Sequence, residues 1–199
     1  AKAHLDAGAK RVVISAPAKG DGAETILLGA NEEKFKGCQI TSNASCTTNA
    51  SSPVIQIMNE TIGIEKAILS TTHAYTASQR IVDSPNPKDW REGRAAAVNI
   101  IPSSTGAAHA VAQAIPELEG KFDASAIRVP VIAGSLSITT ALLGKETNER
   151  EINQLFRDAA ESPRWSKTLA VTEDPVVSTD ILNEPFGAIV DLTLTKVIA

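Results

Sequence analysis

The sequence predicts an α+β domain with a mixed, largely antiparallel sheet covered by helices, preceded by a short α/β segment. Helical and strand patterns alternate over the first 45 residues, as they do in parallel α/β sheets. Strand patterns dominate beyond them, and residues 191–196 (DLTLTK) alternate polar and apolar side chains, as antiparallel strands with one solvated face do. We therefore predict two parts, residues 1–45 and residues 46–199.

The opening part is predicted to hold one helix and three short strands. Residues 1–7 end a helix, because Gly8 suits the left-handed position that follows a helix C-terminus. The β-branched run over residues 11–15 (RVVIS) predicts a buried strand. Two further short strands are expected at residues 26–28 and 38–41.

A helix is predicted to begin close to Cys46. Polar, cap-forming residues there precede an apolar pattern with helical spacing, formed by Val54, Ile55, Met58 and Ile62. Residues 64–72 are the next predicted strand, which carries His73 at its end. The long polar segment over residues 74–104 comes next, and loops of this length inside compact domains are usually functional.

The last part of the chain is predicted to mix strands and helices. In chain order, we expect a helix over 106–115, strands over 126–131 and 135–143, a helix opening at Asn148, and strands over 176–177 and 188–198. Asn148 followed by Glu151 resembles a capping box, which marks the start of a helix.

Composition narrows the class of protein. Of the 199 residues 43% are apolar and 21% charged, which is ordinary for a globular fold. A net charge of −4 gives no general attraction to nucleic acid, and no apolar run or signal peptide predicts a membrane partner or export. The two cysteines lack zinc-motif spacing, so we expect a reduced, cytoplasmic protein without a metal site.

Cys46 is the first candidate for chemistry. It stands among hydroxyl and amide side chains at the predicted start of a helix, where free backbone N–H groups and the helix dipole favour a negative charge. The thiol pKa should fall there, and the same N–H groups can hold an oxyanion. Cys38, in an apolar stretch, is expected to be a small buried side chain instead.

A nucleophilic cysteine needs a base nearby, and the chain offers His4, His73 and His109. His73 follows a strand and opens the long loop, where functional residues tend to lie. His109 lies inside a predicted helix, which favours a structural role. Taken alone, a structural role for His73 is at least as consistent with the sequence.

Several sequence blocks resemble the phosphorylating glyceraldehyde-3-phosphate dehydrogenases. They are SNASCTTN at 42–49, TTHAYT at 71–76, VDSPNPKDWREGRAAAVNIIPSSTGAA at 82–108 and Arg-Val-Pro at 128–130. The resemblance covers the whole chain. It implies that residues 46–199 form the catalytic domain of that family and that residues 1–45 are the remnant of a Rossmann-type NAD-binding domain.

The resemblance also implies an activity, the NAD(P)-dependent oxidative phosphorylation of D-glyceraldehyde 3-phosphate to 1,3-bisphosphoglycerate in glycolysis. Cys46 would attack the aldehyde, His73 would handle the proton, and inorganic phosphate would release the acyl group from a thioester. It further implies a homotetramer, in which the loop over 74–104 contributes to subunit and cofactor contacts.

The family's binding residues carry over onto matching positions. By resemblance, the attacking phosphate is held by Ser45, Thr47, Thr105 and Gly106, the substrate phosphate by Thr76, Arg94 and Arg128, and the nicotinamide lies near Ser15. Thr105 and Gly106 open a predicted helix, which is a good anion site in itself. Arg128 suits a phosphate because a guanidinium binds it through two hydrogen bonds.

The sequence departs from the family in its cofactor-binding half. It begins with Ala-Lys-Ala-His, stops within an expected strand and lacks the glycine-rich turn that cradles a dinucleotide, so we expect a fragment that binds NAD or NADP poorly. Ala77 and Ser78 replace the usual polar pair, and RVPVIAG replaces the usual Arg-Val-Pro-Thr-Pro. Three alternatives stay open: an erythrose-4-phosphate dehydrogenase, a non-enzymatic binding or adhesin fragment, and an acyl-transferring or hydrolytic cysteine enzyme.

Overall fold

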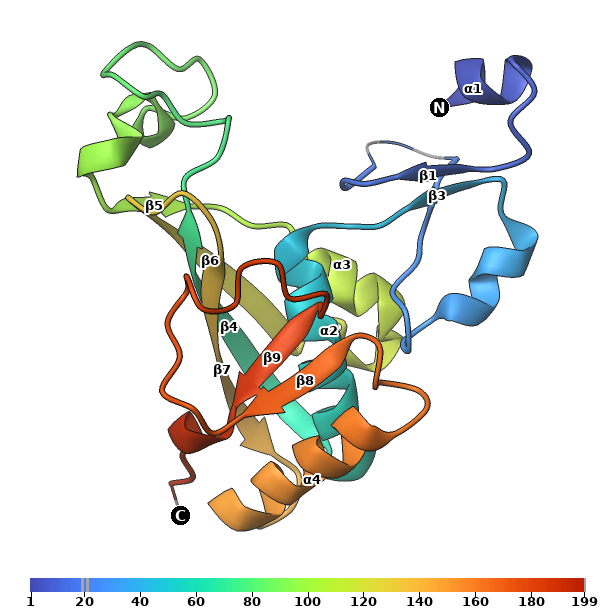
Figure 1. Cartoon of the computed structure of the whole chain (residues 1–199), viewed down its shortest axis with the longest axis vertical. Helices are drawn as coiled ribbons and strands as arrows, with labels where there is room; N and C mark the ends of the chain where they lie inside the picture. The colour runs from blue at the N-terminus through green and yellow to red at the C-terminus, as the bar shows by residue number, and fades with distance from the viewer. Residues whose placement is uncertain (19, 21, 199) are drawn as a thin grey trace.

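The computed structural model describes residues 1–18, 20 and 22–198. Its first part holds a short helix, α1 (Lys2–Asp6), and a parallel three-stranded sheet (Figure 1). The strands lie in the order β1 (Val12–Ile14), β3 (Ile40–Ser42), β2 (Glu24–Thr25). The predicted α/β character of this part is confirmed.

The largest sheet follows in the chain and has four strands. Their order across the sheet is β5 (Ile101–Ser103), β6 (Phe122–Val129), β4 (Ile64–Ala74), β7 (Ser135–Leu143). β4 runs parallel to β6 and antiparallel to β7, and β5 runs antiparallel to β6. The prediction of a mixed, largely antiparallel sheet is therefore confirmed for this sheet.

Three longer helices and a small parallel sheet complete the fold. They are α2 (Cys46–Thr61), α3 (Ala107–Ala114), α4 (Glu149–Glu161), β8 (Leu169–Thr172) and β9 (Ala188–Asp191). Short 3₁₀ helices span Glu32–Gly37, Arg91–Gly93, Ala96–Val98, Pro116–Leu118 and Leu192–Leu194. In the described ranges, no helix combines the length and apolar character needed to cross a bilayer.

Helix α2 lies at the centre of the hydrophobic core. It contacts α3, α4, β4 and β9, and the core cluster includes Ile55 of α2, Leu69 of β4 and Phe156 of α4. Along β4, side chains alternate between this core and the opposite, exposed face, as the period of a strand requires. Because α2 packs against β4, this contact fixes where the start of α2 lies relative to the end of β4.

Side-chain capping explains where two helices begin. The hydroxyl of Ser45 accepts a hydrogen bond from the Thr48 N–H, so α2 starts at Cys46, as predicted. The Asn148 side chain accepts from the Glu151 N–H at the start of α4. Only half of the expected capping box forms there, because the Glu151 carboxylate accepts from the Thr147 hydroxyl instead.

Two of the predicted strands are wrong for local reasons. Residues 26–28 form no strand, because the Asn31 side chain accepts from the Leu27 N–H at 2.8 Å and closes a turn. Residues 176–177 also form no strand, because the Asp180 carboxylate accepts from the Val177 N–H and the chain turns over residues 178–180. Asn and Asp side chains compete in this way with backbone ladders.

Two further expectations need correction. The strand predicted over 188–198 ends at Asp191, whose carboxylate accepts from the Thr193 N–H and starts a 3₁₀ turn, and its partner β8 is parallel rather than antiparallel. The strand over 11–15 forms as β1, but Val13 is 61% exposed, so this strand is not buried.

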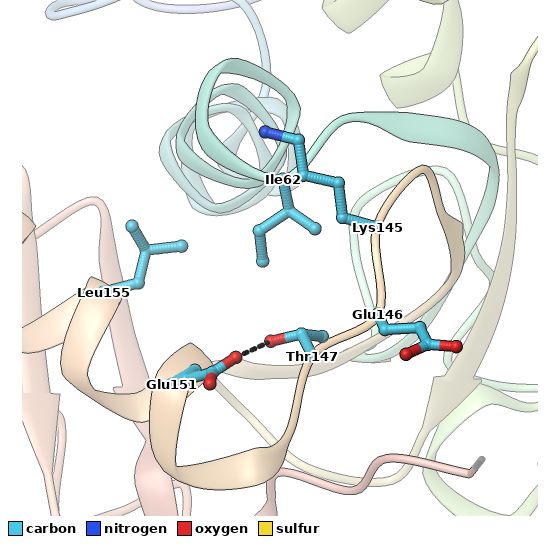
Figure 2. A pocket seen from close by; sticks show the side chains of 6 residues that line it. All are labelled: Ile62, Lys145, Glu146, Thr147, Glu151 and Leu155. Atoms are coloured by element: carbon cyan, nitrogen blue, oxygen red, sulfur yellow. Dashed lines mark hydrogen bonds between the residues drawn. The ribbon is translucent and has the colours of Figure 1, made fainter.

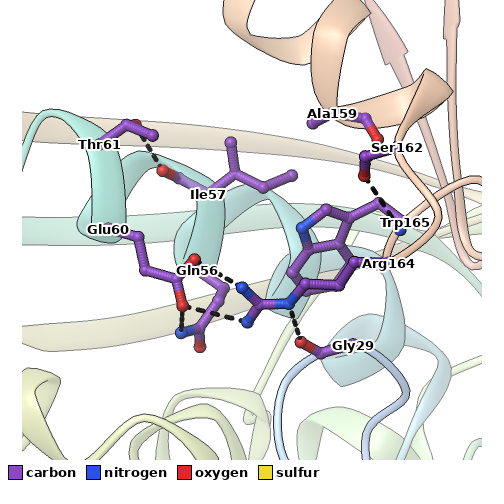
Figure 3. A network of polar contacts seen from close by, with 9 residues as sticks. All are labelled: Gly29, Gln56, Ile57, Glu60, Thr61, Ala159, Ser162, Arg164 and Trp165. Carbon is purple, nitrogen blue, oxygen red and sulfur yellow. Dashed lines mark hydrogen bonds and ion pairs between the residues drawn. The ribbon is translucent and has the colours of Figure 1, made fainter.

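Arg164 and Trp165 tie the opening part of the chain to the rest (Figure 3). The Arg164 Nε donates to the Gly29 carbonyl at 2.6 Å, and its two terminal nitrogens donate to the Glu60 carboxylate at 2.8 and 3.0 Å. The ring of Trp165, which is 4% exposed, packs on Gly29. Gly29 has φ +81°, and a Cβ there would clash with three atoms of that ring.

We predict that Gly29→Ala destabilises the chain by roughly 2–4 kcal/mol, because it combines left-handed backbone with overpacking against Trp165. Urea unfolding followed by Trp fluorescence measures the change in free energy. Gly37→Ala is the matched control, because a Cβ at Gly37 meets no atom within 4 Å. Equal losses of unfolding free energy in the two variants would contradict the role assigned to the packing of Trp165 on Gly29.

Candidate active site

The loop before α2 holds Cys46 in place. Ala44 adopts φ +54°, which is uncommon for a residue with a side chain, and it is buried. The Asn49 amide bridges the loop by donating to the carbonyls of Asn43 and Ser45 at 2.7 and 2.8 Å. The strained residue is therefore stabilised on both sides, and Cys46 becomes the first residue of the helix.

The same loop is joined to the first sheet. The Asn43 N–H donates to the carbonyl of Ile14, the last residue of β1. The Ser42 hydroxyl donates to the Ala16 carbonyl and accepts from the Ala18 N–H. The end of β1, which Ser15 follows, is thus connected by hydrogen bonds to the loop that presents Cys46.

Cys46 and His73 meet at the end of β4. The Cys46 Sγ lies 3.1 Å from the His73 Nε2. The other ring nitrogen, Nδ1, lies 2.7 Å from the Ala74 carbonyl oxygen. Because a carbonyl only accepts hydrogen bonds, Nδ1 carries a proton, and Nε2 is left to exchange a proton with the thiol.

The pKa values of the two groups shift in opposite directions. The pKa of the Cys46 thiol falls to about 7, mainly through the hydrogen bond with His73, although partial burial opposes the change. The backbone and hydroxyl of Thr47 lower it further. The pKa of His73 rises, first because of the bond to Cys46, while burial and the Arg128 charge oppose the rise. Both shifts favour a thiolate–imidazolium pair near neutral pH.

Arg128 lies beside this pair. In the parallel register of β4 and β6, Arg128 is the partner of His73. Its Nε is buried and has no hydrogen-bond partner among the residues that the structure describes. A guanidinium with an unused donor next to a nucleophile is suited to an anionic substrate group.

Some of the predicted anion-binding side chains near the starts of α2 and α3 already form hydrogen bonds within the chain. The Ser45 hydroxyl caps α2 and lies 2.8 Å from the Thr48 hydroxyl, while Thr47 is buried beside Cys46. At α3, Gly106 is the N-cap residue, and the Thr105 hydroxyl accepts from the Ala107 N–H at 3.2 Å. Since α3 packs on α2, both helix starts belong to one packed unit.

The remaining predicted residues lie in loops. Thr76 follows β4 by two positions, and its hydroxyl lies 3.2 Å from that of Ser78. Arg94 forms an exposed ion pair with Asp83 at 3.2 Å, so its guanidinium is engaged within the long loop. Ser15 is exposed, and no hydrogen bond joins it to Cys46 or His73 in the part of the chain that the structure describes.

Sequence reasoning missed two residues that shape the site. Asn49 is one of the amide side chains near Cys46 in the sequence, where nothing in the local pattern shows that it bridges the strained loop. Gln79 is buried in the polar loop and binds Thr76, and a single glutamine in a loop has no periodic pattern that could reveal this. Cys38, expected to be buried, is half-exposed and donates to the Lys34 carbonyl.

A shallow depression of about 200 Å³ lies at the opposite end of α2 (Figure 2). It is lined by Ile62, Lys145, Glu146, Thr147, Glu151 and Leu155. Because α2 rises by about 1.5 Å per residue, Cys46 is roughly 20 Å away. The depression therefore takes no part in the site around Cys46.

Comparison with known proteins agrees with this geometry. Residues 45–199 match the family model described as glyceraldehyde 3-phosphate dehydrogenase, C-terminal domain. Proteins named glyceraldehyde-3-phosphate dehydrogenase from Mycolicibacterium smegmatis, Mycobacterium leprae and Haloarcula vallismortis are 49%, 48% and 48% identical to the chain over its whole length. The chain spans 58%, 58% and 59% of these relatives. With a family match over most of its residues, the chain belongs to the glyceraldehyde 3-phosphate dehydrogenase family.

Proposed function

We propose that this chain carries the catalytic residues of a phosphorylating glyceraldehyde-3-phosphate dehydrogenase of glycolysis. The observation that carries the proposal is the contact of 3.1 Å between the Cys46 Sγ and the His73 Nε2, with the thiol pKa lowered to about 7. The names of the relatives support the choice of substrate. Because the chain spans 58% of those relatives, the complete reaction belongs to the longer protein.

In the proposed reaction, the Cys46 thiolate attacks the aldehyde carbon, and the imidazolium of His73 gives its proton to the oxygen that becomes negative. The product is a thiohemiacetal, with His73 neutral again. The neutral His73 Nε2 is placed to accept the hydroxyl proton of the thiohemiacetal. With a nicotinamide cofactor held by the longer protein to take up the hydride, this proton transfer would leave a thioester on Cys46. Inorganic phosphate then attacks the thioester carbon, which releases the acyl phosphate and restores the thiolate.

A nicotinamide cofactor, NAD or NADP, supplies the hydride acceptor in this proposal. Ser15 is the residue of this chain proposed to lie near it, through the connection of β1 with the Cys46 loop. The sequence has no G-x-G-x-x-G turn, so these residues alone do not fit the dinucleotide. The segments of the relatives that this chain does not span would hold the cofactor.

Two anion subsites complete the proposal. Arg128 and Thr76 bind the substrate phosphate, and the buried, unpartnered Nε of Arg128 beside His73 supports this role. Arg94 joins them if its ion pair with Asp83 opens. The attacking phosphate is assigned to four residues at the starts of α2 and α3, namely Ser45, Thr47, Thr105 and Gly106.

We also propose that residues 1–45 belong to the cofactor-binding domain and residues 46–199 to the catalytic domain. The family match from residue 45 and the separate first sheet support this division. A homotetramer is proposed for the longer protein. Exposed apolar side chains of the long loop, among them Trp90 at 90% exposure, support a role of that loop in subunit contacts.

The thiolate form of Cys46 can be measured by its rate of alkylation. Alkylation of Cys46 by iodoacetamide should follow an apparent pKa near 7. In His73→Asn the stabilising partner is lost, so the thiol pKa rises and the rate at pH 7 falls roughly tenfold. Mass spectrometry of the labelled peptide against pH measures both. Cys38 in the same chain is the internal control, and equal pH profiles for the two cysteines would contradict the assigned pair.

Binding of the proposed substrate can be measured by the protection of Cys46. D-glyceraldehyde 3-phosphate should protect Cys46 from iodoacetamide without any cofactor, because the thiohemiacetal masks the sulfur. D-glyceraldehyde should protect at concentrations roughly 10–100-fold higher, since it lacks the charged group that Arg128 binds.

Arg128→Met should remove most of that preference for the phosphorylated aldehyde. Arg157→Met removes an arginine of α4 that is paired with Glu173; it is the matched control and should leave the preference unchanged. If the unmodified chain is protected equally by both aldehydes, the proposed phosphate subsite is wrong.

A further inference from the structure

Gln79 is a buried polar residue at the start of an exposed loop. Its side chain is hydrogen-bonded to Thr76, since the Gln79 Oε1 accepts from the Thr76 N–H at 2.9 Å. The Gln79 backbone N–H donates to the Thr76 carbonyl, also at 2.9 Å. The turn from Thr76 to Gln79 is thus closed twice, once by backbone and once by the side chain.

This turn continues directly from the strand that carries His73. β4 ends at Ala74, and Thr76 follows two positions later. On the neighbouring strand β6, Arg128 pairs with His73 in the register. The Thr76 hydroxyl, which lies 3.2 Å from the Ser78 hydroxyl, therefore belongs to the same end of the sheet as the Cys46–His73 pair.

Packing alone does not explain why a glutamine, rather than an apolar residue, occupies this buried position. It is 6% exposed, and its Nε2 has no hydrogen-bond partner among the described residues, which costs stability. An apolar side chain of similar size would avoid that cost. It would, however, leave the Thr76 N–H without its acceptor. The amide is therefore needed for its oxygen, which fixes the backbone of Thr76.

We propose that Gln79 is a positioning residue for the phosphorylated substrate, which acts by holding Thr76 where its hydroxyl reaches the substrate phosphate. This inference rests on the proposed role of Thr76 and Arg128 in that subsite. Gln79 does not contact the reacting atoms, so Cys46 and His73 should keep their reactivity without it.

The test measures protection of Cys46 from iodoacetamide in the unmodified chain, Gln79→Leu and Gln79→Met. We expect the concentration of D-glyceraldehyde 3-phosphate that gives half protection to rise roughly tenfold in both variants, the effect of a displaced hydrogen-bonding group. Half protection by D-glyceraldehyde should not change. The rate without aldehyde should also stay constant, which shows that each variant has folded around the dyad.

Asn99→Ala is the matched control. Asn99 braces the same loop by donating to the Ala95 carbonyl at 2.8 Å, but it has no bond to Thr76. An equal loss of protection in Asn99→Ala, or an equal loss with both aldehydes in the Gln79 variants, would overturn the positioning role. Absence of protection in the unmodified chain would instead refute the proposed function. If the leucine variant does not fold, the more adaptable methionine keeps the test decisive.

Discussion

The contact between the Cys46 Sγ and the His73 Nε2 depends on the path of the chain from helix α2 into strand β4. Cys46 opens α2, and the chain turns at Gly63, with φ +85°, into β4, which runs back along the helix. The helix is roughly 24 Å long and the strand up to His73 roughly 33 Å when extended, so the strand is long enough to run back along the whole helix. The separation of 27 residues between the two side chains is therefore the length of one helix plus one returning strand.

The electrostatics of the pair depend on the same arrangement. β6 lies next to β4 and places Arg128 beside His73, where its positive charge opposes the rise of the His73 pKa. Arg128 thus limits the basicity of the neighbouring imidazole, in addition to its proposed role of binding an anionic substrate group. In the proposed reaction, an anion bound to Arg128 would offset that charge, and the imidazole would then hold its proton more firmly while the thiolate attacks.

The sequence predicts those parts of the structure that local patterns specify. Cap-forming residues before an apolar helical pattern place the start of α2 at Cys46, and β7 matches its predicted range, 135–143. The failed strands lie where one side chain captures a backbone N–H, as Asp191 does, and period-two alternation does not reveal such bonds. The pairing of Cys46 with His73 came from resemblance to a family, since three histidines were available.

The tie between Arg164 and Gly29 has a consequence for synthesis on the ribosome. The two residues are 135 positions apart, and Glu60, the other partner of Arg164, is 104 positions from it. The first sheet emerges before the arginine and tryptophan that anchor it, which follow Gly29 by 135 and 136 positions. Until then, Gly29 and the first sheet lack the contacts with Arg164 and Trp165. Closing so long a loop is a late and non-local step, so the first sheet is secured only after Arg164 and Trp165 have been made.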